Sequence, residues 1–471
     1  MEETEFTLSE LAEVDRSSDK YKLLEELFVI PDEDGYILYA PLKKSVLLVN
    51  KAAVRALQEF KEGREAAISR GSDIHERLVK AGILVLERDS DRQIAFEKQD
   101  GEFDPSGVSL FLTTRCSMRC IYCYSKGGDS SKIMPWKTAK TAIDWIIDHT
   151  SRKGRNRFYV NFHGGGEVTM AMPLMKKCVE YARRQANSNG LTASIEAGLN
   201  GVMSVGTADW IIHNLDGATV SLDGLPDIQN AQRPMSNGNT SFERVCATLH
   251  HMDAGKFNYG IRATITQESV DQLVESVKFL SRTFAAAGGI QVEPFFQAGR
   301  AKANRLPAVD PAAFVEKYRK AAKVAADYGK QLKYSGARFG TITNCFCKAT
   351  GNSFAVTPEA QVTSCYEVTD LEDTRAPLFF FGSLDERSGK FRFDQETMNT
   401  LRSLTVENKG YCKDCFCKWH CAGDCPAKLA LNGNAWDSSA NPRCYINQEL
   451  TKDQIKLALN SGNLHELSVE Y

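Results

Sequence analysis

Cysteine is the residue type that most constrains what this chain can fold into. It occurs 14 times in 471 residues, and its positions are clustered. Three cysteines fall between 116 and 123 and nine between 345 and 444, whereas Cys178 and Cys246 stand apart. In a reducing compartment such clusters are expected to bind metal rather than to pair as disulfides. The two isolated cysteines lie in expected helices and are predicted to be small buried hydrophobic side chains.

The remaining composition is that of an ordinary globular chain. Hydrophobic residues make up 42%, charged residues 25%, and the formal net charge is −2. This balance gives no electrostatic reason to expect nucleic acid or a membrane as a partner. No apolar run approaches the ~18 residues of a membrane-spanning helix, and the acidic N-terminus lacks the pattern of a signal peptide. We therefore expect a cytoplasmic protein.

The N-terminal part has the pattern of a small α+β domain over residues 25–88. Strand-like runs flank Asp34-Gly35, a dipeptide typical of hairpin turns, and SVLLV over 45–49 predicts a further strand. Asn50 is suited to cap a following helix, and a second helix is expected over 72–80. The flanking segments are an expected acidic tail over 1–24 and a charged linker over 89–104.

From residue 105 to 335 the chain alternates between apolar strands and helices. Strands are expected at 108–114, 157–162, 193–200, 218–223, 260–266 and 290–296. Six strands that alternate with helices predict an α/β fold with a parallel sheet, either doubly wound or a partial barrel. Ligands bind such sheets at the carboxyl ends of the strands. Those ends carry the notable residues Cys116, His163–Glu167, Asn200, Asp223 and Arg300.

The alternation ends near residue 336. Residues 336–450 are rich in Cys, Gly, Asp and Asn and contain only short expected elements, so a domain here buries little apolar area. Bound metal is therefore the expected source of its order. A final helix is expected at 446–459, with 451–471 forming a C-terminal helix and tail.

The first cysteine cluster has the spacing C-x-x-x-C-x-x-C, formed by Cys116, Cys120 and Cys123. Three thiolates can hold three irons of a [4Fe–4S] cluster and leave the fourth iron open. Structural zinc usually takes four ligands with C-x-x-C pairs. Zinc and plain structural thiols are the alternative interpretations.

This motif, its place after the first strand and the later cysteines resemble the radical S-adenosylmethionine (SAM) superfamily. The resemblance implies a partial (β/α)6 TIM-type barrel over 105–335, in which SAM binds the open iron and is split to a 5′-deoxyadenosyl radical. Cluster potentials can reach about −700 mV, which is low enough for that cleavage. The resemblance also implies that Tyr122 lies against the adenine of SAM.

Further positions match SAM-contacting elements of the family. HGGGE over 163–167 resembles the Gly-Gly-Glu element for the SAM amino group, although Val168 stands where the family usually has Pro. Gln229-Asn230 replace the His-Asp that often precedes the equivalent of Arg233, which puts a role for those two positions in doubt. The positions that the resemblance assigns to SAM are Gly165, Gly166, Glu167, Asn200, Ser221, Asp223 and Arg262.

The second cysteine cluster resembles the SPASM extension of that superfamily. Its spacing is C-x2-C-x5-C-x3-C over 412–425, followed by Cys444. The resemblance implies two auxiliary [4Fe–4S] clusters, three clusters in all with the SAM-binding one. The implied ligands of the first are Cys345, Cys347, Cys365 and Cys425, and those of the second are Cys412, Cys415, Cys421 and Cys444. A zinc ribbon over 412–425 is the alternative.

Two of these cysteines depart from the family pattern. Cys347 is only two residues from Cys345; in an extended strand both would face one side, and a free Cys347 would leave an open iron for a substrate thiolate. Ala360 stands where family chains usually place Gly. Cys417 is surplus to the pattern and is expected to be a plain thiol.

Residues 25–88 resemble the winged-helix peptide-recognition element of ribosomal peptide maturases. The resemblance rests on DGYILYAP, SVLLVN and the GIL that follows the second expected helix. A small sheet with an exposed edge can bind a leader peptide as an added strand. A generic cap or oligomerisation domain is the alternative.

Taken together, the resemblances predict a radical SAM maturase that cross-links a ribosomal precursor peptide through a thioether, C–C or C–O bond. Flavodoxin or ferredoxin is the expected reductant. Three alternatives remain: formylglycine formation on a sulfatase, quinone-cofactor maturation from a peptide, and a non-catalytic multi-cluster electron carrier. Sulfatase-type enzymes carry Asp after the cysteine equivalent to Cys365, where Tyr366 and Glu367 follow here.

Overall fold

The structure is a computed structural model that describes residues 20–33, 35–88, 94, 96, 101–439, 441–461 and 468–469. It divides into two compact units, residues 1–96 with 455–468, and residues 97–454 with 469–471. The expected domains 105–335 and 336–450 therefore lie within one unit. Most of the expected tail and linker lies outside the described residues, although Tyr21–Leu23 of the expected tail form strand β1.

The first unit is built from two small antiparallel sheets and two helices. Strands β2 (Phe28–Asp32), β3 (Gly35–Ala40) and β4 (Ser45–Val49) form one sheet in the order β2-β3-β4, and β1 pairs with β5 (Leu84–Leu86). Asp34 of the expected turn lies outside the described residues. The expected helices are present as α1 (Lys51–Lys61) and α2 (Asp73–Lys80). Asn50 caps α1 as predicted, because its Oδ1 accepts a hydrogen bond from the N–H of Ala53 at 2.9 Å.

The second unit contains one eleven-stranded sheet in the order β12-β11-β10-β9-β8-β7-β6-β14-β15-β16-β17. Its parallel part consists of β6 (Gly107–Leu110), β7 (Arg157–Phe162), β8 (Thr192–Leu199), β9 (Gly217–Ser221), β10 (Tyr259–Ile265), β11 (Ile290–Pro294) and β12 (Leu332–Lys333). These strands follow one another in chain order. A doubly wound sheet reverses its strand order at a switch point, so this alternative is excluded, while the expected α/β class is confirmed.

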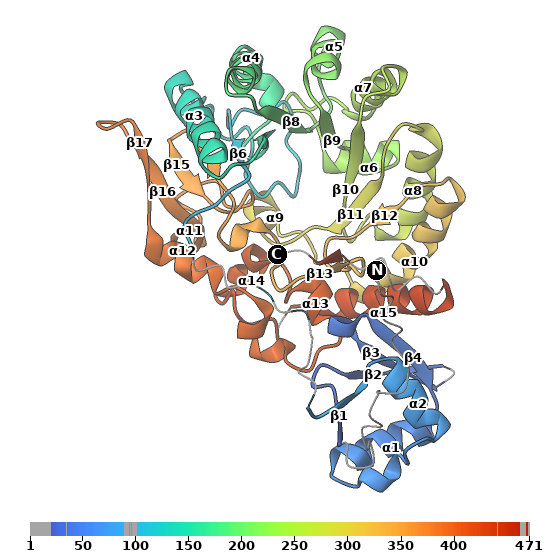
Figure 1. The fold of residues 1–471 in the computed structure, drawn as a ribbon. Helices are drawn as coiled ribbons and strands as arrows, with labels where there is room; N and C mark the ends of the chain where they lie inside the picture. The colour runs from blue at the N-terminus through green and yellow to red at the C-terminus, as the bar shows by residue number, and fades with distance from the viewer. Residues whose placement is uncertain are drawn as a thin grey trace, which may run out of the picture. The chain divides into compact units, whose positions relative to one another are not determined.

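The helices between these strands lie on the outer side of the curved sheet, as Figure 1 shows for α3, α4, α5, α7 and α8. The helices of this part are α3 (Trp136–Arg152), α4 (Met172–Ser188), α5 (Val205–Asn214), α6 (Pro226–Gln232), α7 (Phe242–Ala254), α8 (Leu273–Thr283), α9 (Gly299–Ala303) and α10 (Pro311–Asp327). Side chains alternate between the two faces of a strand: in β7, Phe158, Val160 and Phe162 are buried, whereas Tyr159 is 45% exposed. The inner face of the sheet is thus left free for polar side chains.

The cysteine-rich C-terminal segment continues the same sheet. Strand β14 (Ala355–Val356) pairs in parallel with β6, and β15 (Gln361–Thr363), β16 (Phe380–Asp385) and β17 (Lys390–Phe393) follow as an antiparallel meander. The later helices are short except the last: α11 (Ala376–Phe379), α12 (Gln395–Arg402), α13 (Lys418–Cys421), α14 (Pro426–Leu429) and α15 (Arg443–Ser461). The predicted short elements and final helix are present.

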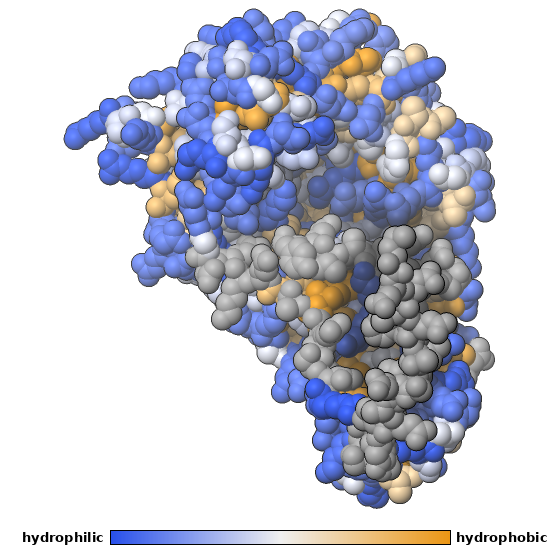
Figure 2. All heavy atoms as spheres, viewed as in Figure 1, coloured by the Kyte–Doolittle hydropathy of each residue, from blue (hydrophilic) through white to orange (hydrophobic). Residues whose placement is uncertain are grey.

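Large apolar side chains exposed on the surface are scattered along the described chain, for example Val205 and Leu371. The face of the molecule in Figure 2 is accordingly mostly hydrophilic, with separate hydrophobic spots where it is coloured. Within the described ranges, no helix is both long enough and apolar enough to cross a bilayer. Cys178 and Cys246 are buried among core side chains, as predicted.

Candidate functional site

The three-cysteine loop follows β6 and is fixed by arginines. Arg119 donates to the carbonyl oxygens of Cys116 at 3.0 Å and Gly128 at 2.8 Å. Arg300, from α9, donates to the carbonyl oxygens of Cys120 at 3.0 Å and Gly127 at 2.9 Å. Because these bonds use the backbone, the three thiols remain available. Two arginine side chains therefore fix the backbone of the loop.

The HGGGE segment lies against the start of this loop. The N–H of Gly166 donates to the carbonyl oxygen of Thr113 at 2.8 Å, and that of Glu167 to Arg115 at 2.7 Å. Gly165 has a φ of +71°, which favours glycine. A Cβ on Gly166 would lie 2.1 Å from the carbonyl oxygen of Arg115, so no larger residue fits there. Glycine is required at these positions by the close approach of two backbones.

Glu167 and Asn200 join two strand ends to the cysteine loop. The buried Glu167 accepts hydrogen bonds from the N–H of Asn200 at 2.7 Å and from the hydroxyl and N–H of Thr169. Burial raises the pKa of Glu167. Asn200 Nδ2 donates to Ser117 Oγ at 2.9 Å and lies 3.8 Å from Cys116 Sγ. A carboxylate accepts about four hydrogen bonds, so Glu167 keeps room for one more donor.

Asp223 is occupied by protein donors. Its Oδ1 accepts from Arg233 Nε at 3.0 Å and from the N–H of Thr264 at 2.9 Å. Its Oδ2 accepts from Gln232 Nε2 at 2.7 Å and from the hydroxyl of Tyr122. These four bonds use the acceptor capacity of a carboxylate. In this structure Asp223 positions Tyr122 and Arg233 rather than presenting a free oxygen to a cofactor.

Arg233 brings a buried positive charge to the cysteine loop. Its guanidinium lies 5.3 Å above the ring of Tyr122, and its Nη1 is 4.0 Å from Cys120 Sγ. Burial raises the pKa of Tyr122 well above its usual value, with Asp223 adding to the shift. Gln229, whose role was in doubt, accepts from the N–H of Asp223 at 2.9 Å and so supports this network.

Ser221, the last residue of β9, is directly paired in register with Arg262, which lies in the middle of β10. Arg262 also acts electrostatically on His163, whose pKa is lowered to about 4, first by burial and then by this arginine. The inner face thus carries a neutral imidazole beside a fixed positive charge.

The thiols of the loop are suited to bind a metal. Burial raises the pKa of Cys116 to about 11 and that of Cys120 to about 12. Such thiols are poor nucleophiles, but a bound metal deprotonates them. In the part of the chain that the structure describes, no three His, Cys, Asp or Glu side chains converge to hold a single metal ion. A cluster is held with one thiolate per iron, which does not require such convergence.

The C-terminal cysteines fall into two groups. In the first, burial raises the pKa of Cys365, and Glu367 and then the thiols of Cys425 and Cys347 shift it in the same direction. Cys347 is exposed as a residue, so its place among these thiols stays a prediction. The assignment of Cys345, Cys347, Cys365 and Cys425 to one cluster stays a prediction from the resemblance.

The second group contains the other implied quartet. The pKa of Cys444 is raised by burial and by the nearby thiols of Cys412, Cys415 and Cys421. Cys417 lies among them, with its Sγ 3.4 Å from Cys415 Sγ and 4.0 Å from Cys421 Sγ. The SPASM spacing pattern does not include Cys417. The signal that could have found it is the run Cys415-x-Cys417, which brings two thiols near each other in a tight turn.

Buried charges tie both groups to the sheet. Arg443, next to Cys444, forms an ion pair with Asp424 at 2.9 Å, and Asp424 is next to Cys425. Arg443 also lies 3.4 Å from Glu293, near the end of β11. Lys409 is buried and donates to the carbonyl oxygen of Gly423 at 2.9 Å. Sequence analysis missed these residues because the motifs were read from the cysteines alone.

The comparisons with known proteins agree with this fold. No protein-family model matches the chain. Uncharacterized protein MJ0907 of Methanocaldococcus jannaschii is 29% identical over 172 residues, which are 36% of this chain and 57% of that protein. The chain thus matches a little over half the length of this curated relative.

Two solved structures are similar over most of their length. The structure of native anSMEcpe with bound AdoMet has a TM-score of 0.58 at 16% identity, over 76% of this chain and 99% of that chain. Streptococcus suis SuiB bound to precursor peptide SuiA has a TM-score of 0.54 at 13% identity, over 90% of this chain and 99% of that chain. At such identities the likeness establishes a shared α/β fold with a large mixed sheet.

Proposed function

We propose that this chain is a radical SAM enzyme that modifies a ribosomally made precursor peptide. The observation that carries the proposal is the loop of three cysteines after β6, with Asn200 and Arg233 beside its sulfurs. The close approach of the Cys415, Cys417 and Cys421 sulfurs in the C-terminal segment adds to it. The fold is shared with a protein solved with AdoMet and with one solved with a precursor peptide, which supports both the cofactor and the class of substrate.

The residues present fit the cofactors. Cys116, Cys120 and Cys123 would hold a [4Fe–4S] cluster, and glycine at 165 and 166 lets the two backbones approach each other closely beside it. When bound, the cluster and SAM supply a 5′-deoxyadenosyl radical. Arg233 offsets the negative charge that deprotonation would place on Cys120. Glu167 keeps one acceptor position for an ammonium group, and Arg262 would attract a carboxylate.

The two C-terminal groups would hold auxiliary [4Fe–4S] clusters. Closing a cross-link removes two hydrogens from the peptide. Hydrogen-atom abstraction accounts for one of them, so the second leaves as a proton and an electron, and the electron needs an acceptor. Cys365 and Cys425 would place one such acceptor beside Tyr366. Flavodoxin or ferredoxin is the proposed external reductant.

The first unit supplies a groove that suits a leader peptide. A cavity of about 500 Å³ lies between strand β4, with Leu47, Leu48 and Val49, and helix α2, with Ile74 and Leu78. Strand β4 stands at the edge of its sheet, where a peptide can add as a further strand. Leu48 is 42% exposed and lines this groove, so alternate apolar side chains of a docked strand would bury it.

Formylglycine formation on a sulfatase is the second candidate, because the SPASM resemblance of the C-terminal cysteines is shared with sulfatase-maturating enzymes. Two observations favour peptide cross-linking instead. Tyr366 rather than an acid follows Cys365. The alignment with SuiB spans 90% of the chain and so reaches beyond residues 97–454, whereas that with anSMEcpe spans 76%. Quinone-cofactor maturation would use the same machinery. A bare electron carrier would have no need for the glycine loop.

The test is anaerobic reaction of the iron-reconstituted full chain with SAM, a reductant and candidate precursor peptides encoded beside its gene. We expect 5′-deoxyadenosine and a peptide mass lower by two hydrogens. Leu48→Asp should retain 5′-deoxyadenosine formation but reduce peptide modification at least tenfold, because it places a charge in the groove. The matched control is Val205→Asp, at a position that is 66% exposed on α5. No 5′-deoxyadenosine from the wild-type chain would contradict the proposal.

A further inference from the structure

Lys409 is a buried cation that lies beside the C-terminal cysteines. The residue is 1% exposed and precedes Cys412 by three positions. The N–H of Cys412 donates to the carbonyl oxygen of Lys409 at 2.8 Å. The ammonium group of Lys409 donates to the carbonyl oxygens of Gly423 at 2.9 Å and Asp424 at 3.4 Å. Both acceptors belong to the turn over 422–424, which separates two of the cysteines in sequence.

This turn has an unusual backbone. Ala422, Gly423 and Asp424 have φ values of +48°, +69° and +64°, so three successive residues adopt the left-handed conformation. Residues other than glycine keep such a conformation where the surrounding structure holds them in it. A Cβ on Gly423 would lie 2.4 Å from Cδ of Lys409, so the lysine packs directly against the turn. Packing and hydrogen bonds therefore fix the position of the ammonium group.

A short series of contacts connects the ammonium group with the second cysteine group. The carbonyl oxygen of Gly423 also accepts a hydrogen bond from Ser438 Oγ at 3.0 Å. That hydroxyl lies 3.9 Å from Cys412 Sγ, and the carbonyl oxygen of Ser438 lies 3.5 Å from Cys444 Sγ. Lys409 thus shares an acceptor with the residue that both of these sulfurs contact.

The charge of Lys409 has no anionic partner in the protein. Within the described ranges, its ammonium group forms no ion pair with a carboxylate, and its acceptors are the two carbonyl oxygens. The side chain of Asp424 is paired with Arg443 instead. Arg233, the buried cation beside the first cysteine loop, has Asp223 as its partner. Because a buried charge without a counterion is costly, Lys409 calls for negative charge from a bound group.

A cluster in the second cysteine group would supply that negative charge. Four thiolates outweigh the positive charge of a [4Fe–4S] core, and net charge is one of the factors that set cluster potentials. Burial lowers the pKa of Lys409, and negative charge at Cys412 is the largest effect in the opposite direction. A nearby positive charge favours the cluster form with one more electron, and little water screens a buried charge.

We propose that Lys409 is the positive charge that offsets the second auxiliary cluster and raises its reduction potential, which makes that cluster a better electron acceptor. The inference rests on the proposed function and adds to it a residue that acts through the cluster. In the step that needs an acceptor, the peptide radical loses one proton to solvent and one electron. The electron reduces the cluster, whose net charge becomes more negative by one.

Lys409→Gln tests this assignment, because glutamine keeps an N–H donor and removes the charge. A redox titration of the iron-reconstituted full chain, followed by electron paramagnetic resonance, measures the potentials. We expect the one-electron equilibrium constant for reduction of the second cluster to fall at least tenfold, which is ~59 mV. Cys412→Ala identifies the signal of that cluster by its loss. The matched control is Lys413→Gln, next to Cys412 but exposed, and it should keep the wild-type potential.

Iron content separates this role from a purely structural one. It should stay at the wild-type level in Lys409→Gln and in Lys409→Met, which keeps the packing against the turn. Loss of iron in both variants would mean that Lys409 only holds the turn, and would overturn the inference. An unchanged potential of the second cluster would also overturn it and leave the proposed function intact. Absence of 5′-deoxyadenosine from the wild-type chain would contradict the proposed function, while the potentials would still decide the role of Lys409.

Discussion

The two cysteine-bearing regions of the second unit are held together in different ways. The loop of Cys116, Cys120 and Cys123 spans eight residues and is fixed by hydrogen bonds from Arg119, Arg300 and the glycine segment. The C-terminal groups collect cysteines from positions 345 to 444, on helices as short as α13 and α14 with four residues each. One region is thus organised locally, and the other joins distant parts of the chain.

This difference indicates where bound iron contributes to order. Local hydrogen bonds that involve no thiol persist without metal, so the loop is organised before a cluster binds. The segments of the C-terminal region outside the β14–β17 meander are short, so they are expected to lose part of their connection when metal leaves. The Asp424–Arg443 pair supplies the C-terminal region with a buried contact of its own, but it connects only one pair of segments.

Removal of iron should therefore have the largest effect on structural order, and this effect should differ most between the cysteine loop and the C-terminal region. In the chain treated with a chelator, we expect backbone amides of residues 345–444 to exchange with solvent deuterium at least tenfold faster than in the reconstituted chain. Amides of residues 113–128 should change far less. Hydrogen exchange followed by mass spectrometry measures both in one sample. Equal acceleration in both regions would contradict the comparison.

Removal of the carboxylate at Asp223 should destabilise the loop that carries Cys116, Cys120 and Cys123. Asp223→Ala leaves the guanidinium of Arg233 buried without its partner, and breaking such a pair typically costs about 3–5 kcal/mol. Chemical denaturation of the second unit would measure the loss in free energy of unfolding. The matched control is Glu180→Ala, which removes an exposed ion pair with Arg184 and should cost well under ~1 kcal/mol. A similar small loss in both variants would show that Asp223 is not structural.

The same contrast explains what could be predicted from the sequence. Strand and helix positions, the cap at Asn50 and the cysteine spacings follow from local pattern, and the structure has these elements where they were expected. The resemblance also implies that Cys425 joins Cys365, which spacing alone could not indicate and which stays a prediction.

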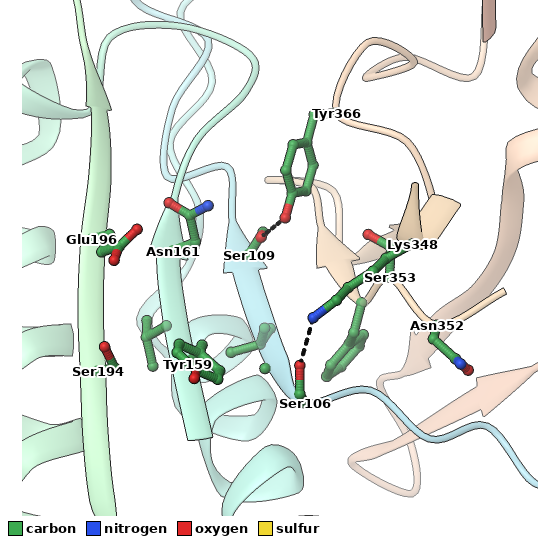
Figure 3. A pocket seen from close by; sticks show the side chains of 14 residues that line it. Ser106, Ser109, Tyr159, Asn161, Ser194, Glu196, Lys348, Asn352, Ser353 and Tyr366 are labelled. Carbon is green, nitrogen blue, oxygen red and sulfur yellow. Dashed lines mark hydrogen bonds between the residues drawn. The ribbon is translucent and has the colours of Figure 1, made fainter. Parts of the chain in front are cut away.

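Other features depend on contacts between distant residues. No pattern near Asp223 indicates that Tyr122, Gln232, Arg233 and Thr264 would use its oxygens. The pairing of β14 with β6 brings together residues more than 240 positions apart. It also brings Tyr366 to a pocket along β6, β7 and β8 (Figure 3). Such features arise from tertiary packing and therefore required the structure.

The smallest effect is expected at His163, whose protonation should make the free energy of unfolding depend on pH. Its pKa is lowered to about 4 by burial and by Arg262, from an ordinary value of 6.5. The folded chain therefore takes up this proton less readily than the unfolded chain. The imidazole's contribution is fully present above pH 6.5 and is lost as the pH falls toward 4, by about 3 kcal/mol at most.

His163→Gln should flatten the fall in free energy of unfolding between pH 6.5 and 4, measured by denaturant titration, because glutamine does not titrate. His213→Gln, at an exposed position on α5, should leave the slope of the wild-type chain unchanged. If His163→Gln keeps that slope, the loss of stability arises elsewhere, and the inner face is more open to water than the burial of this ring indicates.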